Sequence, residues 1–139
     1  MLIAAILPMA TALGKTGAMD VIVAVLMPIG EAGPLPMLAT TFLLTAVLGQ
    51  FVSNTATAVL TAPVAIAAAA HLGVAPEPLL MTVAIAASTS FATPVATPAN
   101  MLVLGPGAYR ARDFARVAIP VQLAVALITL VMVPLLFPF

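Results

Sequence analysis

Two long stretches without any charged residue constrain this chain more than any other feature. No Asp, Glu, Lys or Arg occurs between residues 32 and 76 or between residues 78 and 109. Small polar residues interrupt each stretch: Ser53-Asn54-Thr55 in the first, and Thr-Pro-Val-Ala-Thr-Pro-Ala-Asn over residues 93–100 in the second. Polar, non-helical segments at bilayer depth are costly unless they line a cavity or hold a ligand. The pair therefore predicts a solute site inside an all-α membrane protein.

The composition agrees with a chain that lies in lipid. Hydrophobic residues make up 64% of the sequence and charged residues 6%, and the mean hydropathy is +1.29; average soluble domains carry about 25% charged residues. We therefore expect the lipid bilayer as a partner and a multi-pass location in the cell (inner) membrane. Cysteine is absent, which excludes disulfides and thiol catalysis. No basic cluster is interleaved with aromatic residues, so no nucleic-acid partner is expected.

The first charge-free stretch is too long for one membrane span. As a single helix it would reach about 68 Å, against a hydrocarbon core of about 30 Å. The triplet predicts helices over 37–52 and 56–71, which form a helical hairpin within residues 35–72. This hairpin could be two full spans with a turn in water, or a re-entrant hairpin whose tip stops inside the bilayer. The tip has only neutral hydroxyl and amide groups, which favours the re-entrant form.

The second stretch predicts a discontinuous transmembrane helix over residues 77–105. Pro94 and Pro98 each remove a backbone donor and disfavour helix at the preceding threonine, so we expect half-helices at 77–92 and 99–105. Residues 117–137 are uncharged and have the length of a final transmembrane helix.

The remaining segments complete a single membrane domain over residues 1–139. Residues 1–31 are expected to form a partial helix and an interfacial arm. Three of the four basic residues lie in a loop expected over residues 110–116, which the positive-inside rule places in the cytoplasm. We expect these arginines to fix the topology, with contact to lipid headgroups or to a cytoplasmic partner as an added role. The final span would then end outside, and the hairpin would enter the bilayer from outside.

The two interruptions have the chemistry of an ion and anion site. At a hairpin tip, the free carbonyls that end one helix suit a cation, and the free amides that begin the next suit an anion. The triplet adds neutral oxygens and an amide donor, and the unwound backbone near Ala96 and Thr97 repeats this arrangement with Asn100 beside it. The pair can therefore hold Na⁺ together with a carboxylate or a sulfate.

These residues carry a resemblance to a known family. Phe-Val-Ser-Asn-Thr-Ala-Thr-Ala over residues 51–58, followed by Ala-Thr-Pro-Ala-Asn over residues 96–100, resembles the second half of the divalent anion:sodium symporter family. This family comprises the citrate, dicarboxylate and sulfate carriers of the ion transporter superfamily. Residues 7–17 are similar to the segment before the hairpin in those proteins. The resemblance covers essentially the whole chain and implies a secondary transporter, not an enzyme, which moves a small anionic solute by alternating access.

The resemblance also implies roles for individual residues. The substrate-binding residues would be Ser53, Asn54, Thr55, Thr97, Pro98 and Asn100. The Na⁺ ligands would come from Gly49, Val52, Asn54 and Ala96. Gly49 stands where sodium-coupled members commonly have a hydroxyl residue, which keeps H⁺ coupling open. Beyond Na⁺ as a coupling ion, no cofactor is expected.

The number of hairpins sets a further expectation. Carriers of this family have two inverted repeats, each with its own triplet, whereas this chain has one. We expect a C-terminal repeat that is inactive alone and that needs a missing N-terminal repeat or another copy of the chain. It would be part of a longer gene product or a half-sized subunit. The alternatives are a non-transporting fragment or accessory subunit, and an arsenite or Na⁺/H⁺ carrier of the same superfamily.

Overall fold

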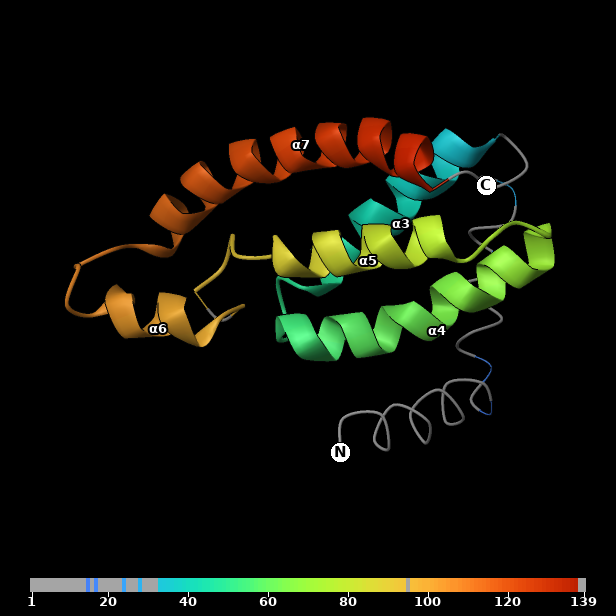
Figure 1. Ribbon diagram of the computed structural model, residues 1–139. Helices are drawn as coiled ribbons and strands as arrows, with labels where there is room; N and C mark the ends of the chain where they lie inside the picture. The colour runs from blue at the N-terminus through green and yellow to red at the C-terminus, as the bar shows by residue number, and fades with distance from the viewer. Residues whose placement is uncertain are drawn as a thin grey trace.

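A computed structural model describes residues 33–94 and 96–137, together with isolated positions before them. In these two ranges the chain is all-helical and contains no strand, as the sequence predicts (Figure 1). The arm expected over residues 1–31 lies outside the continuously described residues. The helices, in chain order, are α3 (Pro34–Leu48), α4 (Asn54–Leu72), α5 (Glu77–Ser88), α6 (Pro98–Leu104) and α7 (Ala111–Leu136).

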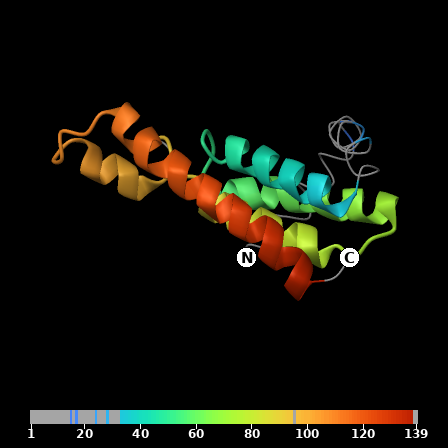
Figure 2. The same ribbon diagram turned by 90° about the horizontal axis from the view of Figure 1, so that it is seen from above.

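Helix α5 lies at the centre of the arrangement. It packs against α3, α4 and α7, while α3 and α4 form an antiparallel hairpin beside it (Figures 1 and 2). Helix α6 makes no contact with another described helix and projects, with the start of α7, beyond the end of the bundle (Figure 1). Helix α7 therefore runs past both halves of the interrupted α5–α6 element, whereas the hairpin accompanies only the α5 half.

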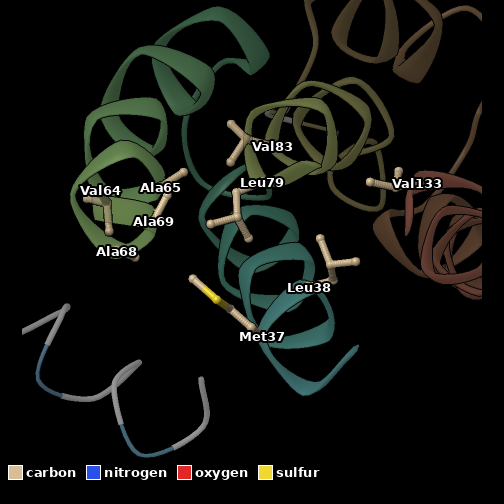
Figure 3. Packing of buried hydrophobic residues seen from close by; sticks show 9 residues of the cluster. All are labelled: Met37, Leu38, Val64, Ala65, Ala68, Ala69, Leu79, Val83 and Val133. Carbon is tan, nitrogen blue, oxygen red and sulfur yellow. The ribbon is translucent and has the colours of Figure 1, made fainter. Parts of the chain in front are cut away.

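Small and branched apolar side chains fill the core between α3, α4 and α5. The alanines of α4 face Leu79 of α5 and Met37 of α3, and Val133 adds the contact from α7 (Figure 3). Small residues at helix contacts let backbones approach closely, which is the usual packing device of membrane helices. The full cluster consists of Met37, Leu38, Val64, Ala65, Ala68, Ala69, Leu79, Val83 and Val133.

The exterior is apolar where a soluble protein would be polar. Two described helices, α4 and α7, are long and apolar enough to cross a membrane, and only 11% of the most apolar window of α7 is buried. A core helix of a soluble protein would bury most of this window. Large side chains of α7 such as Leu123, Leu127 and Leu135 are instead more than 60% exposed. The surface of α7 thus suits contact with lipid or with other apolar helices.

The turn of the hairpin lies earlier in the sequence than predicted. Helix α3 ends at Leu48 and not at residue 52, because the amides of Gln50 and Phe51 bond to carbonyls only three residues back, which closes a tight turn. Helix α4 begins at Asn54 and not at residue 56, because Ser53 Oγ accepts a hydrogen bond from the Ala56 amide at 3.4 Å. The hairpin turn is therefore residues 49–53, and Asn54 and Thr55 belong to the first turn of α4.

The interruption after α5 is present and is longer than predicted. Helix α5 ends at Ser88 and not at residue 92, and α6 begins at Pro98, so the helix break comprises residues 89–97. Thr97 caps α6, since its Oγ1 accepts from the Asn100 amide at 3.3 Å. Proline suits the first position of α6, because a backbone N–H at that position would have no hydrogen-bond partner within the helix.

The arginine segment differs from the expected loop over residues 110–116. Helix α7 begins at Ala111, six residues before the predicted span, so Arg112 and Arg116 lie on a helix. The Asp113 carboxylate accepts a hydrogen bond from the Arg110 amide at 2.8 Å and places a negative charge in the first turn. Both effects stabilise a helix start, and they explain why helix extends through this charged sequence.

Candidate functional site

The two polar interruptions lie side by side at one end of the bundle (Figure 1). Gln50 joins them, since its Oε1 accepts from the Ala92 amide at 2.9 Å and its carbonyl accepts from Thr93 Oγ1 at 2.6 Å. These bonds connect residues more than 40 positions apart in sequence. The hairpin turn and the helix break thus form one polar cluster beside apolar helices.

Helix α7 contributes one polar side chain to this cluster. Gln50 Nε2 donates to the Ala46 carbonyl at 3.1 Å and approaches Gln122 Oε1 of α7 at 3.5 Å. Gln122 otherwise borders an apolar groove of about 310 Å³ between α3 and α7. Its Nε2 atom is buried and has no hydrogen-bond partner in the described part of the chain. Gln50 is therefore the residue at which the turn, the break and α7 come together.

A glycine and a serine permit the close approach of the two segments. Ser90 is fully buried, and its Oγ lies 3.0 Å from the Ala86 carbonyl and 3.3 Å from the Ala46 carbonyl, so the hydroxyl connects α5 to α3. A Cβ added at Gly49 would lie 2.5 Å from Ser90 Cβ and would collide with Ser90 Oγ. The absence of a side chain at Gly49 is thus a packing requirement.

We expect Gly49→Ala to destabilise the protein by about 1–3 kcal/mol, the usual cost of overpacking. Ser90→Gly removes the colliding atoms, so the double variant should lose less stability than the sum of the two single variants. Thermal unfolding of the four proteins of this cycle measures the difference. Gly105→Ala is the matched control, because an added Cβ there meets no atom within 4 Å. Strictly additive losses would contradict the contact.

Asn54 supplies a free oxygen at the site. Its Oδ1 atom is buried, and no described residue donates a hydrogen bond to it. A buried carbonyl oxygen without a partner is costly, so such an atom is usually satisfied by a donor or an ion. The first amides of α4 next to it have no intrahelical partner either. Asn54 can therefore accept a hydrogen bond or coordinate a cation, while the helix start beside it favours an anion.

The other predicted site residues divide into capping groups and backbone positions. Ser53 and Thr97 each use the side-chain oxygen to cap a helix, so each hydroxyl proton remains available to a solute. Thr55 and Pro98 are exposed. The Val52 carbonyl accepts a weak bond from Thr57 Oγ1 at 3.5 Å.

Asn100 and Ala96 help to shape the helix break. Asn100 Nδ2 donates to the Phe91 and Thr93 carbonyls, both at 3.1 Å, so the amide group braces the break and leaves its oxygen for other contacts. Ala96 is buried, and its amide donates to the Thr93 carbonyl at 3.3 Å. No direct bond joins the Ser53–Thr55 triplet to residues 96–100 in the described structure; the connection between them runs through Gln50.

The sequence reasoning missed Gln50, Ser90 and Gln122 as parts of the site. A simple signal could have found the two glutamines: the chain has only four Asn and Gln residues, and all four lie at this cluster. Amide side chains are costly in an apolar environment unless they bond to one another or to backbone. Ser90 gives no such signal, because serine in a membrane helix commonly bonds one turn back.

An interrupted helix that meets a helical hairpin at a polar cluster, with apolar helices around it, is an arrangement typical of one class of protein, the membrane-embedded secondary transporters. The comparison with known sequences specifies the family. The sequence profile described as "citrate transporter" matches residues 1–139, so the chain belongs to the citrate transporter family. The resemblance noted from the two polar segments is thereby confirmed.

Several curated relatives are transporters. The chain is 52% identical over 139 residues to the uncharacterized transporter YfbS of Escherichia coli K12. It is 33% identical over 89 residues, 64% of this chain, to the sodium-dependent dicarboxylate transporter SdcS of Staphylococcus aureus MRSA252. It is 28% identical over 123 residues, 87% of this chain, to the probable sodium/sulfate cotransporter 3 of Chlamydomonas reinhardtii.

The chain spans a small part of each of these relatives. The matched region makes up 23% of YfbS, 17% of SdcS and 14% of the sodium/sulfate cotransporter.

Proposed function

We propose that the complete carrier moves a small divalent anion, such as a dicarboxylate, citrate or sulfate, together with Na⁺ or H⁺ by alternating access. In this proposal the chain is one inverted repeat, the C-terminal one, in the cell (inner) membrane. Its hairpin is re-entrant, its α5–α6 element crosses the bilayer with a break at mid-depth, and α7 is a full span. The chain alone presents half of the site and does not transport.

The observation that carries this proposal is the Gln50 connection between the hairpin turn and the helix break. Because both segments leave regular helix at the same place, their free backbone groups gather around one point, as in the midplane sites of secondary transporters. Two relatives whose names include sodium and a divalent anion support this substrate class.

The proposed roles follow from the chemistry of each group. Asn54 Oδ1 and the carbonyls of Gly49, Val52 and Ala96 would supply neutral oxygens to Na⁺. The first amides of α4, the hydroxyls of Ser53 and Thr55, and the Thr97, Pro98 and Asn100 segment would hold the anion. A cation and an anion held side by side offset one another's charge, which lowers the cost of taking either out of water.

Transport by the complete carrier in proteoliposomes tests the proposal. We expect saturable uptake of labelled succinate, citrate or sulfate that depends on an imposed Na⁺ gradient or on an imposed pH gradient. Comparing the two gradients identifies the coupling ion. Arsenite uptake, or Na⁺/H⁺ exchange without movement of any divalent anion, would overturn the proposal in favour of another carrier type. The chain expressed alone should insert without giving uptake.

A further inference from the structure

Three arginines gather at the start of α7 without acidic partners. Arg110, Arg112 and Arg116 are all exposed, and they are three of the four basic residues of the chain. Within residues 33–94 and 96–137 no carboxylate oxygen lies within 4.0 Å of an arginine nitrogen. Asp113 is the nearest acid in sequence, and its carboxylate bonds to the Arg110 amide. The cluster thus keeps a net positive charge with free guanidinium donors.

An apolar pocket of about 270 Å³ lies next to these arginines. Its lining consists of Phe91 from the helix break together with Tyr109, Asp113, Phe114 and Val117. The rings of Tyr109 and Phe114 pack edge to face with centroids 5.9 Å apart. Three lining residues are sequence neighbours of an arginine, since Tyr109 precedes Arg110, Asp113 follows Arg112 and Val117 follows Arg116. The pocket and the charges therefore form one surface.

A glycine keeps this pocket in shape. A Cβ added at Gly107 would collide with the ring of Tyr109, and the loop that contains it turns sharply at Ala108, whose φ is 51°. The loop thus folds Tyr109 back over its own backbone and onto Phe114. The conformation of this loop therefore places the Tyr109 ring against the Phe114 ring in the wall of the pocket.

The surface lies where the polar and apolar parts of α7 meet. The uncharged run of α7 begins at Val117, immediately after Arg116, and Val117 is 64% exposed. Basic residues that directly precede an apolar span lie at the depth of lipid headgroups, and tyrosine prefers the same zone. The charge of the cluster and its position both complement an anionic headgroup with its acyl chains directed along α7.

We propose that this surface is a binding site for one anionic phospholipid. The arginines bind the headgroup phosphate, and an acyl chain enters the pocket against Phe91, Phe114 and Val117. Phe91 belongs to the helix break, and its carbonyl is held by Asn100 at 3.1 Å. A lipid in this pocket therefore contacts the break directly through Phe91. The inference does not depend on which solute the carrier moves.

Lipid binding to the complete carrier tests this proposal. The carrier is titrated in detergent with short-chain phosphatidylglycerol or phosphatidylcholine, and bound lipids are counted by native mass spectrometry. We expect one saturable phosphatidylglycerol molecule with clear preference over phosphatidylcholine. Arg112→Gln with Arg116→Gln should weaken it roughly 10- to 30-fold, because each basic residue near an anionic surface contributes about 1 kcal/mol. Lys15→Gln, which removes one charge elsewhere, should leave this binding unchanged.

Two further arms separate the alternatives. Phe114→Ala should reduce phosphatidylglycerol binding, because an acyl chain uses the pocket. In the unmodified carrier, inorganic phosphate should not compete with phosphatidylglycerol, because a free anion does not use the pocket. Equal binding of phosphatidylglycerol and phosphatidylcholine by the unmodified carrier would overturn the proposal, and this measurement needs no substitution. Competition by inorganic phosphate would also overturn it and would assign the arginines to a soluble anion.

Discussion

Replacing Asn54 by alanine should nearly abolish uptake by the proposed complete carrier at anion and Na⁺ concentrations that half-saturate the unmodified protein. The substitution removes the buried Oδ1 atom that has no partner in the described structure, together with the amide donor beside it. A hydrogen bond to a charged group contributes about 1.5–3 kcal/mol, so the affinity for the bound ion or anion should fall roughly 10- to 100-fold. The measurement is the initial uptake rate over a range of anion and Na⁺ concentrations in vesicles that contain equal amounts of inserted protein.

Thr97→Ala should abolish uptake as well, and Thr40→Ala provides its matched control. Thr97, in the helix break, caps α6, whereas Thr40 lies on α3 and, among the described residues, its hydroxyl bonds to the Pro36 carbonyl one turn back, at 2.8 Å. Both substitutions remove one hydroxyl and one methyl group. A difference in uptake between the two variants is therefore caused by the position of the threonine and not by the type of substitution. Normal uptake in both Asn54→Ala and Thr97→Ala would refute the proposed site.

Gln50→Met should impair uptake strongly without preventing insertion. Methionine keeps the length of the side chain but cannot replace the acceptor for the Ala92 amide at 2.9 Å or the donor to the Ala46 carbonyl at 3.1 Å. A buried donor left without a partner costs about 1–3 kcal/mol, and the break should lose its fixed position against the hairpin turn. Uptake kinetics and thermal unfolding of the same preparations measure the two effects.

Gln122→Met is the control for that prediction. Its only bond within the described structure is the 3.5 Å contact with Gln50, and its Nε2 atom is buried without a partner there. Removing an unsatisfied buried donor can stabilise a protein, so we expect a loss in uptake and stability well below that of Gln50→Met. Equal losses in the two variants would show that the bonds of the Gln50 side chain to α3 and to the helix break are not the decisive ones.

Much of the helical order could be predicted from the sequence. Charge-free length and proline positions gave a hairpin, an interrupted helix and a final apolar helix, because lipid leaves the backbone few alternatives to helix. The helix ends were less accurate. Ser53 and Thr97 start α4 and α6 as N-caps, and Asp113 stabilises the early start of α7 among the arginines, so each of these boundaries depends on a local hydrogen bond that hydropathy does not register.

The candidate site could be predicted as a pair of segments but not as a set of contacts. The unusual polar groups of Asn54 and Asn100 mark both interruptions in the sequence. The role of Gln50 in joining the two segments depends on which backbone amide lies opposite its side chain. That amide belongs to Ala92, and nothing about an alanine side chain in the sequence indicates that its backbone forms this hydrogen bond. Such a partner becomes visible only after α3 and α5 are packed.

The amino-acid sequence alone determined that the chain is apolar and that a hairpin turn lies next to Ser53–Thr55 and a helix break next to residues 93–100, because these features follow from residue type and spacing along one segment; the structure places the turn at residues 49–53 and the break at 89–97. Only the tertiary structure decided that the hairpin turn meets the helix break through Gln50, that the absence of a side chain at Gly49 makes room for Ser90, and that the buried Asn54 oxygen has no donor among the described residues. These contacts depend on the approach of α3, α5 and α7, which side-chain volume and backbone geometry set together.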